Sequence, residues 1–218
     1  MDREQTIQEL VDKKIMVVVR GIYGEELLKL AAALQAGGIK CFEITYDPAD
    51  PNTLEVIKDN IRMLNDHFHD KLLLGVGTVL NKEQVINAKE AGAKFIVSPN
   101  FNEDVVKETV KQGLVSIPGC MTPTEICDAN DAGADFIKLF PAGTLGIKYC
   151  KDIYAPLHHV RYFATVGVTE ETFAEYLKIG FSGAGISSQL IDKKCRDAGN
   201  YEELTNRARR FVEIAKNY

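Results

Sequence analysis

Hydrophobic residues recur along the chain with two different spacings. Some stretches carry apolar residues three and four positions apart, as in Leu27, Leu28, Ala31 and Leu34, which predicts amphipathic helices. Short, almost wholly apolar runs follow these stretches, and several are preceded by a glycine. Glycine is the usual residue just past a helix, and strands covered on both faces lack polar alternation. The pattern therefore predicts helices that alternate with the buried strands of a parallel sheet.

Eight strands are predicted in this way. They lie near residues 15–20, 40–45, 72–77, 95–98, 114–118, 135–140, 160–165 and 182–186. Seven helices separate them and a last helix spans about 201–217, while Ile7, Leu10 and Val11 predict a docking helix at the N-terminus. Eight βα units without a linker favour a closed barrel over a doubly wound sheet. We predict an α/β fold with one domain, residues 1–218: a single (β/α)8 TIM barrel with a short N-terminal helix.

The composition limits the kinds of molecule that we expect the protein to bind. The net charge is −5, from 26 basic and 31 acidic residues, so the chain lacks the basic footprint of a protein that binds nucleic acid or anionic membrane. No apolar stretch approaches the roughly 18–20 residues of a membrane span. The five cysteines form no CxxC pair, which is typical of free thiols in a reducing compartment. We expect a cytoplasmic protein that acts on a small molecule.

Polar residues stand at the ends of the predicted strands. In (β/α)8 barrels the chemistry lies at the C-terminal ends of the strands. The residues there are Arg20, Glu43, Thr45, Thr78, Ser98, Asn100, Lys138, Thr165, Ser187 and Ser188. The predicted fold brings all of them to one mouth of the barrel.

Lys138 lies in the middle of the apolar run Phe136–Phe140, which Pro141 closes. An unpaired buried ammonium is costly, so this lysine is expected to be paired, to snorkel toward solvent, or to be a neutral amine. A neutral lysine can attack a carbonyl carbon and form a Schiff base. Glu43 would face the same interior, where it could shuttle protons for such an adduct or simply form an ion pair with Lys138. Both interpretations stay open at this point.

Glycine-containing turns follow several strands. Gly75 and Gly77 precede Thr78, and Pro99 lies in a tight turn after the fourth strand. Barrels often bind phosphate through backbone N–H groups in the loops after strands seven and eight. Here those loops contain Thr165, Gly167, Gly185 and Ser188. The glycine content is modest, so the residues alone leave phosphate binding open.

Together these features resemble the 2-keto-3-deoxy-6-phosphogluconate/4-hydroxy-2-oxoglutarate (KDPG/KHG) aldolase family, which includes the 6-phosphogalactonate aldolases. The similarity rests on the glutamate of strand two, GVGTVL, SPN, IPG, FIKLFPA and the turn after strand eight, and it runs from about Ile15 to Leu190. It implies a class I aldolase in which Lys138 forms an imine with a 2-keto acid and Glu43 is the general acid/base. Cleavage would release pyruvate and an aldehyde. The imine is itself the electron sink, so the resemblance implies no metal and no other cofactor.

The resemblance also implies substrate contacts and an assembly. Thr78 and the turn at Pro99 would hold the pyruvate moiety, Phe140 would pack against it, and Arg20 would be a cationic partner. The substrate-binding residues expected at the other end of the site are Thr165, Gly167, Gly185 and Ser188. Members of the family commonly form homotrimers, so we expect one here.

Three positions depart from the family pattern. Asp47 follows strand two where an arginine is usual, Val166 stands where a Gly-Gly pair is usual, and Ser187 replaces a common glycine. The imine machinery is thus retained while recognition of the distal end of the substrate is altered. We expect the preferred substrate to be unphosphorylated or a different sugar acid. Two alternatives stay open: a non-aldolase phosphate-binding barrel, and a non-catalytic barrel that binds a sugar acid.

Overall fold

The computed structural model describes residues 1–218 apart from the side chain of Asp70. The strands are β1 (Ile15–Val19), β2 (Cys41–Thr45), β3 (Leu73–Gly77), β4 (Phe95–Val97), β5 (Val115–Ile117), β6 (Gly119–Cys120), β7 (Ile137–Leu139), β8 (Tyr162–Thr165) and β9 (Gly183–Ile186). The helices are α1 (Arg3–Lys13), α2 (Gly24–Ala36), α3 (Thr53–Phe68), α4 (Lys82–Ala91), α5 (Glu103–Lys111), α6 (Pro123–Asp131), α7 (Ala142–Tyr154), α8 (Glu170–Ile179), α9 (Lys193–Asp197) and α10 (Tyr201–Lys216), with a 3₁₀ turn, η1 (His69–Lys71).

The strands form a parallel barrel that closes through Pro118. The order of pairing is β5-β4-β3-β2-β1-β9-β8-β7-β6, so the two ends of the sheet are the consecutive segments β5 and β6. Pro118 lies between β5 and β6; because proline has no N–H, it interrupts the hydrogen-bond ladder at this point. Its carbonyl still accepts a hydrogen bond from the Lys138 N–H at 2.9 Å, which ties this strand to β7. β5 and β6 are therefore one strand of the barrel, of which the sequence predicted residues 114–118, and the (β/α)8 fold is confirmed.

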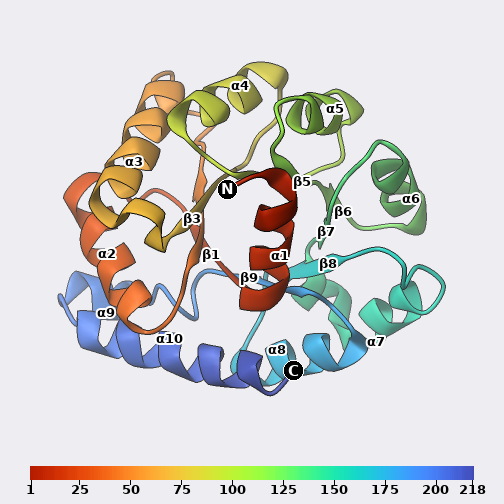
Figure 1. The fold of residues 1–218 in the computed structure, drawn as a ribbon. Helices are drawn as coiled ribbons and strands as arrows, with labels where there is room; N and C mark the ends of the chain where they lie inside the picture. Colours follow the sequence, from red (N-terminus) through yellow and green to blue (C-terminus); the bar gives the residue numbers. More distant parts are fainter.

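Two apolar cores separate the inside of the barrel from its outer shell. The shell core fills the space between the strands and the ring of helices seen in Figure 1, and it includes Phe42 and Ile44. The inner core fills the bottom of the barrel; its buried residues outside α1 are Met16, Cys41, Leu73, Phe95, Val97, Val115, Ile117, Phe136 and Phe163. Because side chains alternate along a strand, residues two positions beyond this floor also point inward, toward the carboxyl ends of the strands.

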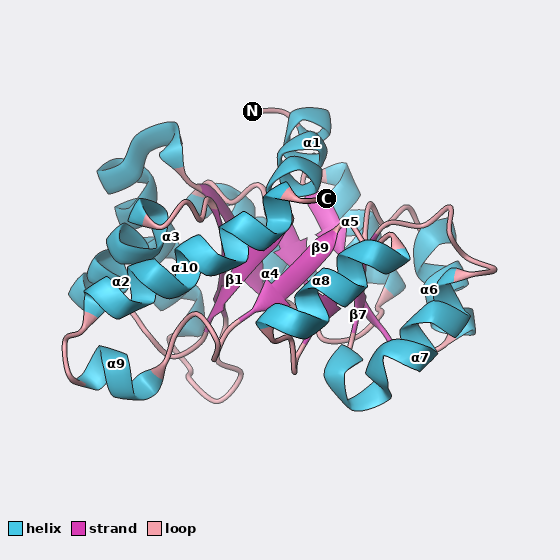
Figure 2. Cartoon of the chain, turned by 90° about the horizontal axis from the view of Figure 1, so that it is seen from below, coloured by secondary structure: helices cyan, strands magenta, loops and turns pink.

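Helix α1 closes the bottom of the barrel, as the spacing of Ile7 and Leu10 predicts. Both side chains join the inner core, and Figures 1 and 2 show α1 lying across the amino-terminal end of the strands. Asp2 caps the helix through a reciprocal pair of hydrogen bonds with Gln5. Closure at this end leaves the opposite end, where the strands terminate, as the side from which the interior can be reached.

The last helices differ slightly from the prediction. α10 packs against α2 and α8 and so completes the ring, whereas the short α9 between β9 and α10 was not predicted. Its five residues include no buried side chain, so it lacks the apolar periodicity that reveals a helix in a sequence. None of the helices in the described part of the chain combines the length and apolarity needed to cross a bilayer.

Candidate active site

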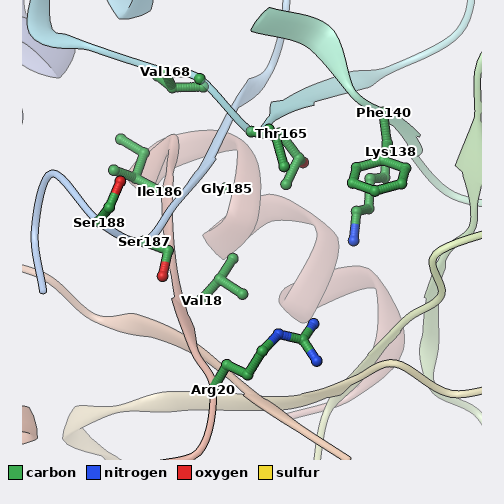
Figure 3. Close-up of a pocket in the computed structure, with 12 residues that line it drawn as sticks. Val18, Arg20, Lys138, Phe140, Thr165, Val168, Gly185, Ile186, Ser187 and Ser188 are labelled. Atoms are coloured by element: carbon green, nitrogen blue, oxygen red, sulfur yellow. The ribbon is translucent and has the colours of Figure 1, made fainter. Parts of the chain in front are cut away.

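A cavity of about 270 Å³ opens at the carboxyl ends of β1, β7, β8 and β9. Figure 3 shows the side chains that converge on it from these strands. The lining residues are Val18, Arg20, Lys138, Phe140, Thr165, Val166, Gly167, Val168, Gly185, Ile186, Ser187 and Ser188. Seven of the ten predicted site residues are among them. The other three, Glu43, Thr78 and Pro99, lie outside this lining.

Lys138 projects from the middle of β7 into the cavity. Its side chain lies two positions beyond Phe136 of the barrel floor, and the residue is only 6% exposed. The amine lies 5.0 Å from the centroid of the Phe140 ring, and in Figure 3 it points toward the Arg20 guanidinium across the cavity. No carboxylate among the described residues forms an ion pair with it within 4.0 Å. The direct Lys138–Glu43 ion pair that the sequence left open is therefore not formed.

Glu43 lies inside the barrel on β2 and is 1% exposed. Burial raises the pKa of this carboxyl, and the positive charges of Lys138 and Arg20 offset only part of that effect. Within the described part of the protein, its Oε2 atom has no hydrogen-bond partner. A carboxyl group with a raised pKa and a free oxygen, close enough to feel the charge of Lys138, is suited to donate and accept protons.

Gly77 makes room for the Glu43 carboxyl. A Cβ atom at Gly77 would lie 1.9 Å from Glu43 Oε1, and one at Gly75 would lie 2.2 Å from the Phe95 ring. The two glycines of β3 thus accommodate side chains of the neighbouring strands. The contact could be anticipated only by aligning β2 with β3, which pair in parallel with Thr45 opposite Gly77.

Arg20 and Thr78 meet above the end of β2. The guanidinium donates a hydrogen bond of 3.0 Å to the Thr78 hydroxyl, although the two residues are 58 positions apart in the sequence. Thr78 has a φ of 58°, which is unusual for a β-branched residue. Arg20 therefore reaches across the mouth of the barrel and lines the cavity, and Thr78 takes part in the site through Arg20. Pro99 is outside the cavity lining, and its carbonyl packs on Gly119, where a Cβ atom would lie 2.4 Å from the Pro99 oxygen.

Val166 lies at the far side of the cavity, in the loop after β8. Its φ is 74°, and its carbonyl accepts a hydrogen bond of 2.9 Å from the Gly143 N–H. The adjoining Gly167 packs so closely on Gly143 that a Cβ on either would lie less than 3.0 Å from the other's backbone. The loop is thus fixed with the branched side chain of Val166 at the cavity wall. Asp47, the other main departure, accepts a hydrogen bond from the Ala49 N–H in a turn and is outside the cavity lining.

Three lining residues were not predicted: Val18, Val168 and Ile186. The search of the sequence looked for polar interruptions of apolar strands, and apolar residues give no such signal. Alternation could have found Val18, since it lies two positions before Arg20 on the same face of β1. Among the described residues, no three His, Cys, Asp or Glu side chains lie close enough to hold a metal ion.

Comparison with known proteins agrees with this geometry. A family model described as KDPG and KHG aldolase matches residues 6–207. The 2-dehydro-3-deoxy-6-phosphogalactonate aldolase of Escherichia coli K12 is 34% identical over 200 residues, which are 91% of this chain and 93% of that enzyme. The 2-dehydro-3-deoxy-phosphogluconate aldolase of Haemophilus influenzae is 31% identical over 214 residues, 98% of either chain.

A solved structure adds chemical detail. The KDPG aldolase of Legionella pneumophila, with pyruvate captured as a covalent carbinolamine intermediate, matches with a TM-score of 0.82 and 26% identity over 94% of this chain and 97% of that one. The family match and the relatives above 30% identity each cover most of this chain. The protein therefore belongs to the KDPG and KHG aldolase family and is a carbon–carbon lyase.

Proposed function

We propose that the protein is a class I aldolase that cleaves a 2-keto acid to pyruvate and an aldehyde through an imine on Lys138. The observation that carries the proposal is the buried Lys138 amine, which points into the cavity without an acidic partner among the described residues. An amine in this position can attack the carbonyl carbon of a keto acid bound in the cavity and form the imine. The Legionella pneumophila relative, with its captured pyruvate carbinolamine, supports this chemistry.

Glu43 is the general acid/base of this proposal. It protonates the hydroxyl that leaves C2 during imine formation and accepts a proton from the C4 hydroxyl when the C3–C4 bond breaks. The electrons of that bond pass to the imine and form an enamine, which is then protonated at C3 to give the pyruvate imine. A carboxyl group whose pKa is raised by burial can hold and release protons closer to neutral pH than an exposed one.

The remaining side chains of the site divide into two groups in this proposal. Arg20 carries the positive charge that binds the substrate carboxylate, Thr78 and the turn at Pro99 support that end, and Phe140 packs against the pyruvate moiety. The rest of the substrate lies toward β8 and β9, along Thr165, Gly167, Gly185 and Ser188. In Figure 3 the Lys138 amine points toward Arg20, while Thr165, Gly185 and Ser188 lie along another side of the cavity.

We infer that a 6-phosphate is not favoured at the β8–β9 side. Val166 lines the cavity there, and the first turn of α8 carries Glu171, whose charge opposes an anion, next to Glu170, which forms an ion pair with Arg210. The N-terminus of α8 is also capped by its own Thr169. The relatives include aldolases named for phosphorylated sugar acids. The inference is therefore tested by comparing kcat/KM for the phosphorylated keto acid with kcat/KM for its dephosphorylated form.

Borohydride trapping tests the proposal. Reduction of the protein with pyruvate should add one reduced pyruvate unit to Lys138, located by peptide mass spectrometry, and Lys138→Met should carry none. A folded protein that gives no adduct, beside a positive control that does, would support a barrel that only binds a sugar acid. In that case pyruvate would raise the melting temperature without any turnover.

The assembly and compartment are further predictions. We infer a homotrimer from the family resemblance, and a cytoplasmic location from the free cysteines. Light scattering coupled to size-exclusion chromatography would test the trimer: the monomer mass is 24.2 kDa, so a particle of about three times that mass is expected.

A further inference from the structure

The loop after β3 places Thr78 at the mouth of the barrel. Thr78 has a φ of 58°, and its hydroxyl accepts the 3.0 Å hydrogen bond from Arg20. A β-branched residue disfavours this backbone conformation, which persists where the surroundings determine it. The hydrogen bond from Arg20 reaches the side chain of Thr78 and not its backbone, so other contacts are needed to hold the loop.

Gln84 holds the far end of this loop. Its Oε1 atom accepts a hydrogen bond of 2.6 Å from the Leu80 N–H, two positions after Thr78. The Leu80 side chain is 38% exposed and so offers little packing, whereas Gln84 is only 7% exposed. A short hydrogen bond to the oxygen of a buried amide, and not burial of Leu80, therefore fixes the chain at this point.

Tyr46 holds the near end of the loop and also contacts α4, from which Gln84 projects. The Tyr46 N–H donates a hydrogen bond of 2.9 Å to the carbonyl of Gly77, the residue before Thr78. The Tyr46 hydroxyl lies 3.1 Å from the Gln84 carbonyl oxygen, and the tyrosine is fully buried. Thr78 thus lies between two tethered residues, and both tethers lead to the buried pair Tyr46 and Gln84.

We propose that Gln84 is a positioning residue for binding of the substrate carboxylate. It sets the place of Thr78, whose hydroxyl receives the Arg20 guanidinium, and Arg20 binds the carboxylate in the proposed function, on which this inference rests. Gln84 is outside the cavity lining and so acts only through these residues. It lies in the first turn of α4, where a polar residue is common, and the sequence analysis therefore did not single it out.

The effect of Gln84 is specific to ligands that carry a carboxylate. A displaced Arg20 weakens the binding of a carboxylate, while the Lys138 amine and the carbonyl carbon that it attacks are unaffected. Pyruvate and acetone are both methyl ketones and form the same kind of imine, but acetone has no carboxylate for Arg20. The ratio of their trapping rates therefore reports the carboxylate contact separately from the reactivity of Lys138.

Gln84→Met removes the acceptor oxygen at nearly constant side-chain length and tests the role directly. The rate of borohydride trapping on the Lys138 peptide is measured by mass spectrometry, with subsaturating pyruvate and separately with subsaturating acetone. We expect the pyruvate-to-acetone ratio to fall about tenfold, which corresponds to about 1.4 kcal/mol of weaker carboxylate binding. Gln84→Asn, which is too short to reach the Leu80 N–H, should give the same low ratio and replaces Gln84→Met if that protein does not fold.

Two further variants separate positioning from stability. Gln84→Glu keeps an oxygen that can accept from the Leu80 N–H and should restore the ratio. Gln112→Met is the matched control: the Gln112 amide donates a 2.6 Å hydrogen bond to Glu108 at the C-terminus of α5, where the chain leads into the amino-terminal end of β5. Its loss can lower the melting temperature but should leave the pyruvate-to-acetone ratio unchanged.

Three results would overturn the proposal. One is a Gln84→Met protein with the ratio of the parent. The second is an equal loss of both trapping rates, because a purely structural change would affect Lys138 with either ketone. The third is a Gln84→Glu protein whose ratio stays as low as that of Gln84→Met. If the parent protein forms no adduct with pyruvate, the proposed function itself fails and this inference fails with it, which is distinguishable from all three.

Discussion

Replacing Gly77 by alanine should impair acid/base catalysis by Glu43 while the Glu43 side chain itself is left unchanged. The new Cβ would lie 1.9 Å from Glu43 Oε1, and real Cβ atoms essentially never approach closer than 3.0 Å, so the carboxyl must move by about 1.1 Å. Glu43 is 1% exposed and cannot swing out into solvent. A displacement of about 1 Å from the productive geometry can cost about 10²-fold in rate, which corresponds to about 2.7 kcal/mol of transition-state stabilisation.

The assay is steady-state retro-aldol cleavage, with pyruvate release coupled to a dehydrogenase. Gly77→Ala should lower kcat about 10²-fold, and Glu43→Gln should lower it by a similar or larger factor, because general acid–base catalysis contributes about 10²–10⁴-fold. The double variant should be no slower than Glu43→Gln alone, since both changes act on one group. Gly75→Ala is the matched control. It changes a glycine of the same strand, β3, but places the new Cβ against the Phe95 ring of β4. It should therefore lower the stability of the protein, and its effect on kcat should be independent of the Glu43→Gln substitution.

Two results would refute this reasoning. One is a Gly77→Ala protein whose kcat stays within threefold of the parent. The other is a double variant whose loss is the product of the two single losses, which would mean that Gly77 acts independently of Glu43.

Three further predictions concern single residues of the site. Lys138→Met should abolish turnover and trapping while the fold, checked by circular dichroism, is kept, because an unbranched apolar side chain fits the buried strand; appreciable residual turnover would remove Lys138 from its role. Glu43→Gln should raise the melting temperature relative to the parent at pH 8 but not at pH 4. Burial raises the pKa of this carboxyl, so its ionisation costs stability only as the pH rises from the ordinary glutamate value through the raised one; a difference that is constant with pH would contradict this. Val166→Gly should increase kcat/KM for the 6-phosphorylated keto acid relative to its free form by about tenfold, the discrimination expected from about 1.4 kcal/mol of relieved contact. An unchanged ratio would show that Val166 does not limit the phosphate.

The sequence predicted those parts of the molecule that depend on local pattern. Apolar runs and helical spacing located all eight strands, and Ile7 and Leu10 located the helix that closes the barrel. Lys138 was recognised because a charged residue inside an apolar run is conspicuous. Its position inside the barrel then follows from alternation with Phe136.

Contacts between strands could not be predicted in the same way. Whether Glu43 contacts Lys138, and why Gly77 is a glycine, both depend on the register of β2 against β3 and on the closure of the barrel. The sequence allowed an ion pair with Lys138, whereas the carboxyl instead packs on Gly77. Pro118 shows the same limit: the run 114–118 was predicted as one strand, and only the pairing reveals that it continues to Cys120 as β6.

Backbone strain is a further feature that the residue types conceal, and its placement ties the two sides of the site together. Among the described residues, four that are not glycine have a positive φ; Lys14 and His69 are helix C-caps, and Lys14 has the left-handed conformation that is common there. The other two, Thr78 and Val166, are β-branched and disfavour it, and they lie on opposite sides of the barrel mouth. Each is engaged by one hydrogen bond from another part of the chain: Arg20 donates to the Thr78 hydroxyl, and the Gly143 N–H donates to the Val166 carbonyl. Strain of this kind costs of order 1–3 kcal/mol and persists where the surroundings determine the conformation. Its presence at the two loops that would flank a bound keto acid, one near the carboxylate and one near the distal end, is consistent with a mouth whose shape is set before the substrate arrives.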